Sequence, residues 1–192
     1  MKNVIILGAN GNIAQQVTDM LAPLDDIKLT LFLRNPGKLK NKDVSKCVIM
    51  EGDVLNYDQL RAAIKGQDMV YANLAGDLEA MAKNIVKAMN ETGVKKIIFI
   101  SAIGIYEKPL KPILVPYRKA ADVIESSDLD YTILRPAWFT DTEEVNYETT
   151  QKGQPEKGSV ISQKSLAALI TKIIHTPGKF TRENLGVNQP HS

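Results

Sequence analysis

Two glycines and an alanine near the N-terminus have the spacing needed to bind the diphosphate of a dinucleotide. They lie in Gly8-Ala9-Asn10-Gly11-Asn12-Ile13-Ala14, between an apolar run and a segment of helical period. Gly8 permits a tight turn, Gly11 lets the backbone approach the phosphates, and Ala14 lets a helix pack closely on a strand. Because the N-terminus of a helix attracts anions, we expect this turn to bind the diphosphate. The expected binding residues are Gly8, Asn10, Gly11, Asn12 and Ile13; a plain strand–helix turn is the alternative.

Arg34 stands where the ribose of the dinucleotide would be recognised, directly after the second apolar run. An acidic residue there would bind the 2′-hydroxyl of NAD, whereas a guanidinium pairs with the 2′-phosphate of NADP. Lys38 and Lys40 could add positive charge nearby. The pattern therefore predicts NADP(H) in preference to NAD(H), with an exposed surface arginine as the alternative interpretation.

Two further turns follow apolar runs and contain candidate contacts to the rest of the dinucleotide. Asp53 could accept from the adenine amino group while Val54 packs on the ring, although Asp53 could instead cap a helix beginning near Asn56. The small residues after the fourth run would let the chain pass close to the ribose and nicotinamide, unless they form an ordinary turn. These residues are Leu74, Ala75 and Gly76.

The alternation of apolar runs and helical stripes predicts an α/β fold of the Rossmann type, a doubly wound parallel sheet in one domain. Strands are expected over 4–7, 27–33, 46–50, 68–73, 95–101, 131–134, 159–161 and 185–187, and helices over 13–21, 57–64, 78–89, 118–127 and 166–174. Residues 137–192 are expected to contribute a small substrate-side lobe or lid, and 141–157 a loop or lid within it.

Composition excludes several classes of function. The chain has 192 residues and a net charge of +2, too little to favour nucleic acid or a membrane surface. No apolar run approaches the roughly 18 residues of a membrane span. Cys47 is the only cysteine, so no internal disulfide can form, and we expect a cytoplasmic protein. No metal site is expected, since His175 and His191 lie apart in late segments.

With these motifs in place, the chain resembles the atypical short-chain dehydrogenases/reductases, in the compact NAD(P)H-binding group that includes NmrA-like proteins and relatives of biliverdin and flavin reductases. The matching segments are 8–14, Leu33-Arg34-Asn35-Pro36, Gly52-Asp53-Val54, Ser101-Ala102-Ile103-Gly104, Lys119-Ala120-Ala121-Asp122 and 130–136. The resemblance implies a Rossmann fold, an NAD(P)H cofactor, and a position beside the nicotinamide for Pro136.

Ordinary members of that family use serine, tyrosine and lysine in catalysis, with the last two four residues apart. Ser101 and Tyr117 are candidates here, but the position four after Tyr117 is alanine. Lys119 lies only two residues on, about 200° around a helix, so a helical Tyr117 could not share its face. Lys119 could still contact the cofactor ribose. Ser101 as a strand-end cap, Lys119 as a surface charge, and Tyr106 as a different donor or as lid packing are the alternatives.

These observations predict an NADPH-dependent reductase that passes hydride to a small flat acceptor: a flavin, a quinone or an unsaturated carbonyl. Such acceptors can take their proton from water, so catalysis would depend on position and exclusion of water. Trp138 and Phe139 could form an aromatic wall for the acceptor, or they could belong to the core. A non-catalytic NADP(H) sensor that binds a protein partner is the second hypothesis, and a nucleotide-sugar epimerase or dehydratase the third. We expect a monomer or a weak homodimer.

Overall fold

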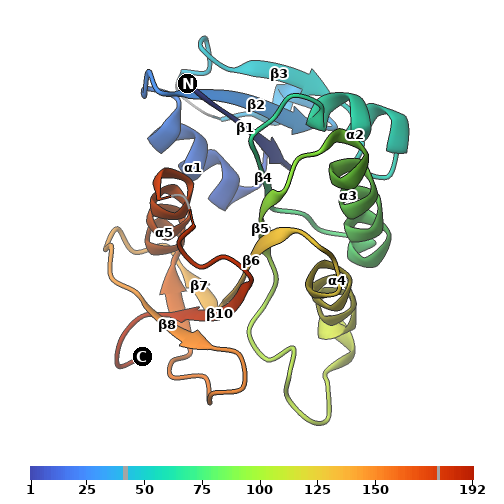
Figure 1. The fold of residues 1–192 in the computed structure, drawn as a ribbon. Helices are drawn as coiled ribbons and strands as arrows, with labels where there is room; N and C mark the ends of the chain where they lie inside the picture. Colours follow the sequence, from blue (N-terminus) through green and yellow to red (C-terminus); the bar gives the residue numbers. More distant parts are fainter. Residues whose placement is uncertain (41–42, 177) are drawn as a thin grey trace.

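A computed structural model describes residues 1–40, 43–176 and 178–192, and eight of its strands form one twisted sheet (Figure 1). The strand order is β3-β2-β1-β4-β5-β6-β10-β8, and every pairing is parallel except that of β8 with β10. The bounds are β1 (Lys2–Leu7), β2 (Ile27–Leu33), β3 (Val48–Glu51), β4 (Met69–Ala72), β5 (Lys96–Ile100), β6 (Asp130–Pro136), β8 (Glu148–Gln151) and β10 (Glu183–Asn188). This is the single Rossmann-like domain that the sequence predicts.

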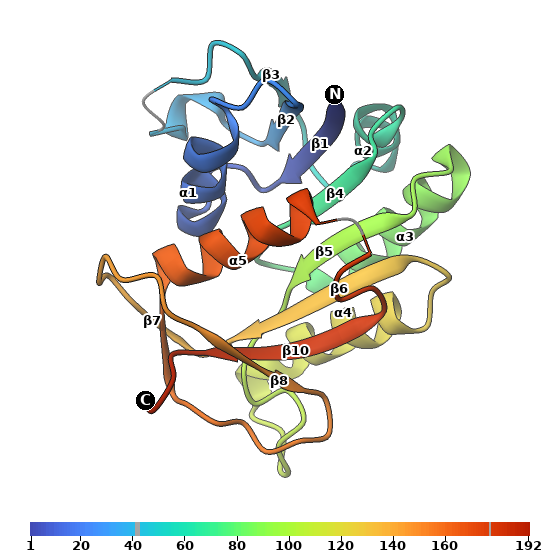
Figure 2. The same cartoon turned by 60° about the vertical axis from the view of Figure 1, so that its left-hand side comes forward.

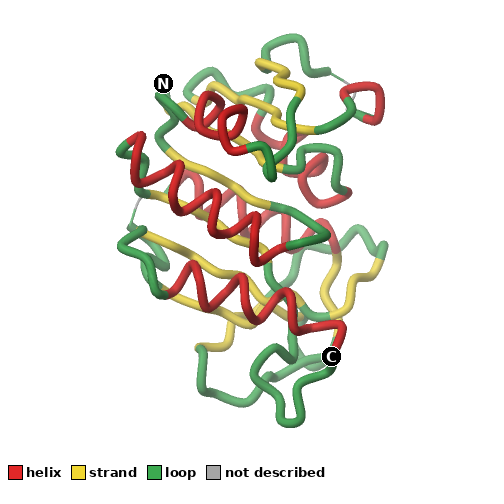
Figure 3. The backbone as a smooth tube through the Cα atoms, turned by 90° about the vertical axis from the view of Figure 1, so that its right-hand side faces the viewer, coloured by secondary structure: helices red, strands yellow, loops and turns green. Residues whose placement is uncertain are grey.

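Helices cover both faces of the sheet. Helices α1 (Asn12–Leu21) and α5 (Gln163–His175) lie side by side on one face, which Figure 2 brings forward. Helices α2 (Tyr57–Ile64), α3 (Leu78–Thr92) and α4 (Val115–Glu125) cover the other face, seen in Figure 3. Two short 3-10 turns, η1 (Pro36–Lys38) and η2 (Pro112–Leu114), complete the helical elements of the described residues.

The central strands are apolar throughout because both of their faces are buried. In β1, Val4 and Ile6 pack under α1 and α5, whereas Ile5 and Leu7 pack in the opposite core under α2, α3 and α4. All four side chains are inaccessible to solvent. Continuous apolar strands of this kind are typical of parallel sheets covered by helices on both sides.

The structure corrects the sequence prediction in the last third of the chain. Strand β8 lies inside the segment expected to be a loop or lid; its sequence, Glu-Thr-Thr-Gln, has no apolar run because β8 is an edge strand with only Thr150 buried. Strand β7 (Trp138–Thr140) is also new, and it pairs in parallel with β9 (Val160–Ser162) in a second small sheet. Residues 137–192 thus supply two strands of the main sheet as well as α5.

Helix α4 begins at Val115, three residues earlier than expected. Pro116 lies in its first turn, where the missing N–H of proline has no helical partner to lose. Tyr117 is therefore helical. Helix α3 continues three residues beyond the expected end at 89, and Gly93 caps it in the left-handed conformation with φ of 76°.

Candidate functional site

The glycine turn between β1 and α1 is packed against Asn73, the residue that follows β4. Gly8 has φ of +79°, and its N–H donates to the carbonyl oxygen of Phe32 at 3.0 Å. A Cβ on Gly8 would collide with the carbonyl oxygen of Asn73, and one on Gly11 with the side-chain Nδ2 of Asn73. Gly8 therefore needs glycine because of its positive φ and the backbone in its way, whereas the obstacle at Gly11 is the movable end of a side chain. Gly11 is also the N-cap of α1, and no side chain of the described residues caps that end of the helix.

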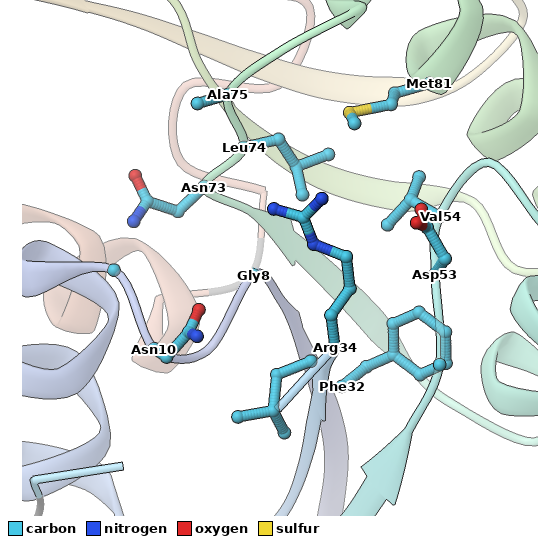
Figure 4. Close-up of a pocket in the computed structure, with 13 residues that line it drawn as sticks. Gly8, Asn10, Phe32, Arg34, Asp53, Val54, Asn73, Leu74, Ala75 and Met81 are labelled. Carbon is cyan, nitrogen blue, oxygen red and sulfur yellow. The ribbon is translucent and has the colours of Figure 1, made fainter. Parts of the chain in front are cut away.

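A cleft of about 280 Å³ opens beside this turn, at the carboxyl ends of four neighbouring strands (Figure 4). From β1 the chain goes to β2 and β3 on one side and then returns to β4 on the other, so the cleft lies at the topological switch point of the sheet. The lining residues are Gly8, Asn10, Gly11, Phe32, Leu33, Arg34, Gly52, Asp53, Val54, Asn73, Leu74, Ala75 and Met81.

Eight of the residues expected to bind the cofactor come together in this cleft: Gly8, Asn10, Gly11, Arg34, Asp53, Val54, Leu74 and Ala75. Six others do not line it, namely Asn12, Ile13, Gly76, Ser101, Lys119 and Pro136. The sequence analysis did not select Phe32, Leu33, Asn73 or Met81 for the cofactor. Asn73 carried a usable signal, a polar residue that directly follows a fully buried strand, whereas Met81 reaches the cleft only through the placement of α3.

Arg34 follows β2 and extends into the cleft toward Leu74 and Val54 (Figure 4). Its side chain is exposed, and no hydrogen bond or ion pair to another described residue holds the guanidinium. Among the described residues, Arg34 and Asp53 are the only charged ones that line the cleft. Lys38 ends η1 and lies outside the lining. The guanidinium is therefore free to bind an anionic group in the cleft.

Asp53 does not cap α2, so that alternative is wrong. The cap is Asn56, whose side chain accepts from the Gln59 N–H at 3.2 Å. Asp53 instead accepts from the N–H of Leu55 at 2.9 Å, which shapes the turn between β3 and α2. Val54 beside it is 5% exposed and packs in the core under α2 and α3.

The candidate catalytic residues lie beyond β5 and do not form a tyrosine–lysine pair. Ser101 is buried, and its hydroxyl donates to the backbone carbonyl of Tyr117 at 3.4 Å. Lys119 is 58% exposed and forms an ion pair with Glu79 of α3 at 3.0 Å. A hydrogen bond from Lys83, and then the one from Lys119, lowers the pKa of Glu79. Because α4 is already helical at Tyr117, Tyr117 and Lys119 point to different sides of it.

A buried polar cluster lies at the far end of β6, just before Pro136. Arg135 is 1% exposed; its guanidinium contacts the Glu156 carboxylate at 3.0 Å and the backbone carbonyl of Asn184 at 2.9 Å. It also lies 5.3 Å from the centre of the Tyr106 ring. The charge of this arginine is therefore neutralised inside the protein.

Tyr106 belongs to the same cluster and is not placed to donate a proton to a substrate. Its hydroxyl accepts from Asn184 Nδ2 at 2.7 Å and lies 3.4 Å from the carboxylate of Glu125, which also pairs with Lys152 at 2.7 Å. Burial and then the Glu125 carboxylate raise the pKa of Tyr106. Within the described ranges no group of three His, Cys, Asp or Glu could hold a metal ion, and no helix there could cross a membrane.

Comparison with known proteins agrees with this geometry. A family described as NAD(P)H-binding matches residues 8–177, most of the chain. A Rossmann-fold NAD(P)-binding family protein from Shigella flexneri is 49% identical, with a TM-score of 0.93 over all of this chain and 95% of that one. A short-chain dehydrogenase/reductase from Veillonella parvula, solved in complex with NADP, is 26% identical with a TM-score of 0.87 over 99% and 95% of the two chains.

Two curated relatives also match the chain. "Uncharacterized sugar epimerase YhfK" of Bacillus subtilis is 26% identical over 184 residues, covering 85% of this chain and 78% of that protein. An isoflavone reductase homologue of Nicotiana tabacum is 26% identical over 171 residues, or 82% of this chain. The chain spans about half the length of that plant relative, 55%. By the family match, the switch-point cleft and its glycine turn, the protein belongs to the NAD(P)H-binding family of atypical short-chain dehydrogenases/reductases.

Proposed function

We propose that the protein is an NADPH-dependent reductase that passes hydride to a small flat acceptor: a flavin, a quinone or an unsaturated carbonyl. The observation that carries the cofactor preference is the Arg34 guanidinium, which extends into the cleft without a protein counter-ion among the described residues. A charge-assisted, two-pronged contact with a phosphate is the interaction that arginine makes best. The NADP-bound relative from Veillonella parvula supports the same preference.

The residues of this chain fit a dinucleotide in an extended pose across the strand ends. The glycine turn and the N-terminus of α1 would hold the diphosphate, Arg34 the 2′-phosphate, and Asp53 and Val54 the adenine. Leu74 and Ala75 would then lead toward the ends of β5 and β6. When bound, NADPH supplies a hydride.

The separation of Tyr117 from Lys119 favours an acceptor that needs no tyrosine–lysine pair. A reduced flavin or quinone takes its proton from water, so the protein contributes position and exclusion of solvent from the hydride path. A ketone, by contrast, needs a proton donor near its oxygen. The hydroxyl of Ser101 already donates to a backbone carbonyl, which argues against its use as that donor.

The direct test is oxidation of NADPH with a panel of riboflavin, FMN, water-soluble quinones, enones and simple ketones. We expect turnover with the flavins or quinones and none with the ketones. The ketone arm serves as the control for the missing proton donor. Turnover restricted to ketones would contradict the proposal.

A second candidate is a non-catalytic NADP(H) sensor, which the same separation of Tyr117 and Lys119 favours. Tight binding of NADPH, without turnover of any acceptor in the panel, would support the sensor. This outcome is separable from loss of the cofactor site, because binding is measured by titration and turnover by absorbance.

A further inference from the structure

None of the residues that line the described cleft follows β5 or β6. The cleft lies over β2, β1 and β4, with Arg34 and Asp53 at the side of β2 and β3. Neighbouring strands lie about 4.8 Å apart, so the nicotinamide end must extend past β4 toward β5 and β6. An acceptor that receives hydride there is bounded by the segments that follow these two strands, the loop after Ile100 and β7 after Pro136.

The segment after β6 exposes an aromatic side chain at this place. Trp138, the only tryptophan of the chain, is 73% exposed. Its neighbour Phe139 pairs with Ile161, which is fully buried, whereas Trp138 pairs with Val160. Phe139 is 46% exposed, so neither aromatic residue belongs to the core. Because successive side chains of a strand point to opposite faces, Trp138 and Phe139 lie on opposite sides of β7. The two aromatic residues therefore do not form one wall.

The indole is carried on a backbone that is fixed from both sides. The Trp138 N–H donates to the Ser159 carbonyl at 3.0 Å, and β7 pairs with β9. The following loop is attached to α5 through two fully buried hydroxyls: Ser162 donates to the Glu144 carbonyl at 2.7 Å, and Ser165 accepts from the Asn146 N–H at 2.9 Å. A large aromatic face on a fixed backbone binds a flat ligand at little cost in conformational entropy.

The loop beside Trp138 carries acidic residues and no basic ones. Asp141, Glu143 and Glu144 are exposed. Lys164 pairs with Glu143, and Asp141 accepts a hydrogen bond from the uncharged Gln163, so the loop keeps a net negative charge. This local charge disfavours acceptors that carry a phosphate or carboxylate. An uncharged planar ring is the ligand that suits both the indole and the loop.

We propose that Trp138 is the acceptor-binding residue, and that it stacks on an uncharged, planar aromatic hydride acceptor. This inference rests on the proposed reductase function and specifies its substrate class. It assigns Trp138 a role in specificity, through contact with the acceptor, and no role in binding the dinucleotide.

The test is a titration of riboflavin, a neutral flavin, into protein saturated with NADP⁺, followed by riboflavin emission excited with visible light. No turnover occurs in this complex, so the result is independent of activity. Trp138→Leu removes the aromatic face but keeps an apolar side chain, and Trp138→Phe restores a ring. Val48→Ala, on the exposed edge strand β3 at the opposite edge of the sheet, controls for loss of an exposed apolar side chain.

We expect Trp138→Leu to weaken riboflavin binding about tenfold, and Trp138→Phe to recover most of that loss. Val48→Ala should leave riboflavin binding unchanged, and all three variants should bind NADP⁺ as the parent does. Riboflavin affinity of Trp138→Leu within twofold of the parent would overturn the assignment. So would absence of riboflavin binding by parent protein that binds NADP⁺, and in that case turnover with the remaining acceptors still decides the reductase proposal.

Discussion

The two ends of the sheet's carboxyl edge use charged residues in opposite ways. Over β1, β2 and β4 the cleft is lined by glycines and apolar side chains, and its one cation, Arg34, has no partner among the described residues. At the end of β6, Arg135 is almost fully buried and binds Glu156, Asn184 and the Tyr106 ring. The first region leaves its polar groups to a ligand, whereas the second uses them to hold segments of the protein together.

Arg34 follows β2 and Arg135 lies near the end of β6 in the same sheet. Because only Arg135 is held by protein partners, we expect the two arginines to respond differently to substitution. Removal of Arg34 should cost ligand binding with little effect on folding. Removal of Arg135 should cost stability, because its partners would remain in place without it. The predictions that follow test this contrast in order of decreasing effect.

Arg135→Met should produce the largest loss of stability. It leaves the Glu156 carboxylate and Asn184 without their partner, and breaking a buried ion pair costs about 3–5 kcal/mol; the lower end is expected because Glu156 is 25% exposed. Urea unfolding measures this loss. Arg118→Met is the matched control, since Arg118 also lies over Tyr106 but pairs with Asp122 at the surface and should cost less than about 1 kcal/mol. Equal losses of unfolding free energy in the two variants would show that the buried Arg135 ion pair stabilises the fold no more than the surface pair of Arg118.

Arg34→Glu should weaken NADPH binding far more than NADH binding. Loss of a charge-assisted phosphate contact costs about 1.5–3 kcal/mol, and repulsion between the new carboxylate and the phosphate adds to that. Titration calorimetry with both dinucleotides measures the change. Lys38→Glu, the same charge reversal outside the cleft lining, should have a much smaller effect. A variant at Arg34 that keeps the parent's preference would remove the basis of the NADPH assignment.

Gly11→Ala should weaken binding of both dinucleotides, because the added Cβ collides with the side-chain amide of Asn73. Neighbouring atoms must shift to make room for the added Cβ, and such shifts cost about 1–3 kcal/mol of free energy. The double variant Gly11→Ala/Asn73→Ala removes the obstacle and should regain part of the affinity. If the double variant binds no better than Gly11→Ala alone, the amide of Asn73 is not what the glycine accommodates.

Lys119→Met should have the smallest effect. The ion pair with Glu79 is exposed, and such pairs contribute about 0.2–1 kcal/mol. NADPH affinity should stay within about twofold of the parent, as expected for a residue outside the cleft lining. A tenfold loss of NADPH affinity would instead show that Lys119 reaches the cofactor ribose, as the family resemblance implied.

Eight of the residues that line the first region were expected from the sequence because their determinants are local. A glycine between a strand and a helix, or an arginine at a strand end, has the same consequence wherever the fold is a parallel sheet. Met81 was missed because only the packing of α3 brings it to the cleft. The position of Asn73 directly after a buried strand could have been recognised in the sequence. Its packing against Gly11 could not, because the two residues are far apart in the chain.

The second region could not be predicted because its contacts join segments that are far apart in the chain. The residues that make these contacts belong to no recognisable sequence motif. Strand β8 has a polar sequence and forms only against β10, and Glu156 reaches Arg135 from an irregular segment. The start of α4 was displaced by three residues, yet the geometric argument about Tyr117 and Lys119 depended only on Tyr117 being helical, which the structure shows.

Titration of the unmodified protein with NADPH and with NADH, under identical buffer and salt, tests the central assignment most directly. The Arg34 guanidinium has no partner among the described residues, and it predicts that NADPH binds at least about tenfold more tightly than NADH, which corresponds to one charge-assisted contact with the 2′-phosphate. Equal affinities for the two dinucleotides, or no heat of binding with either, would contradict it.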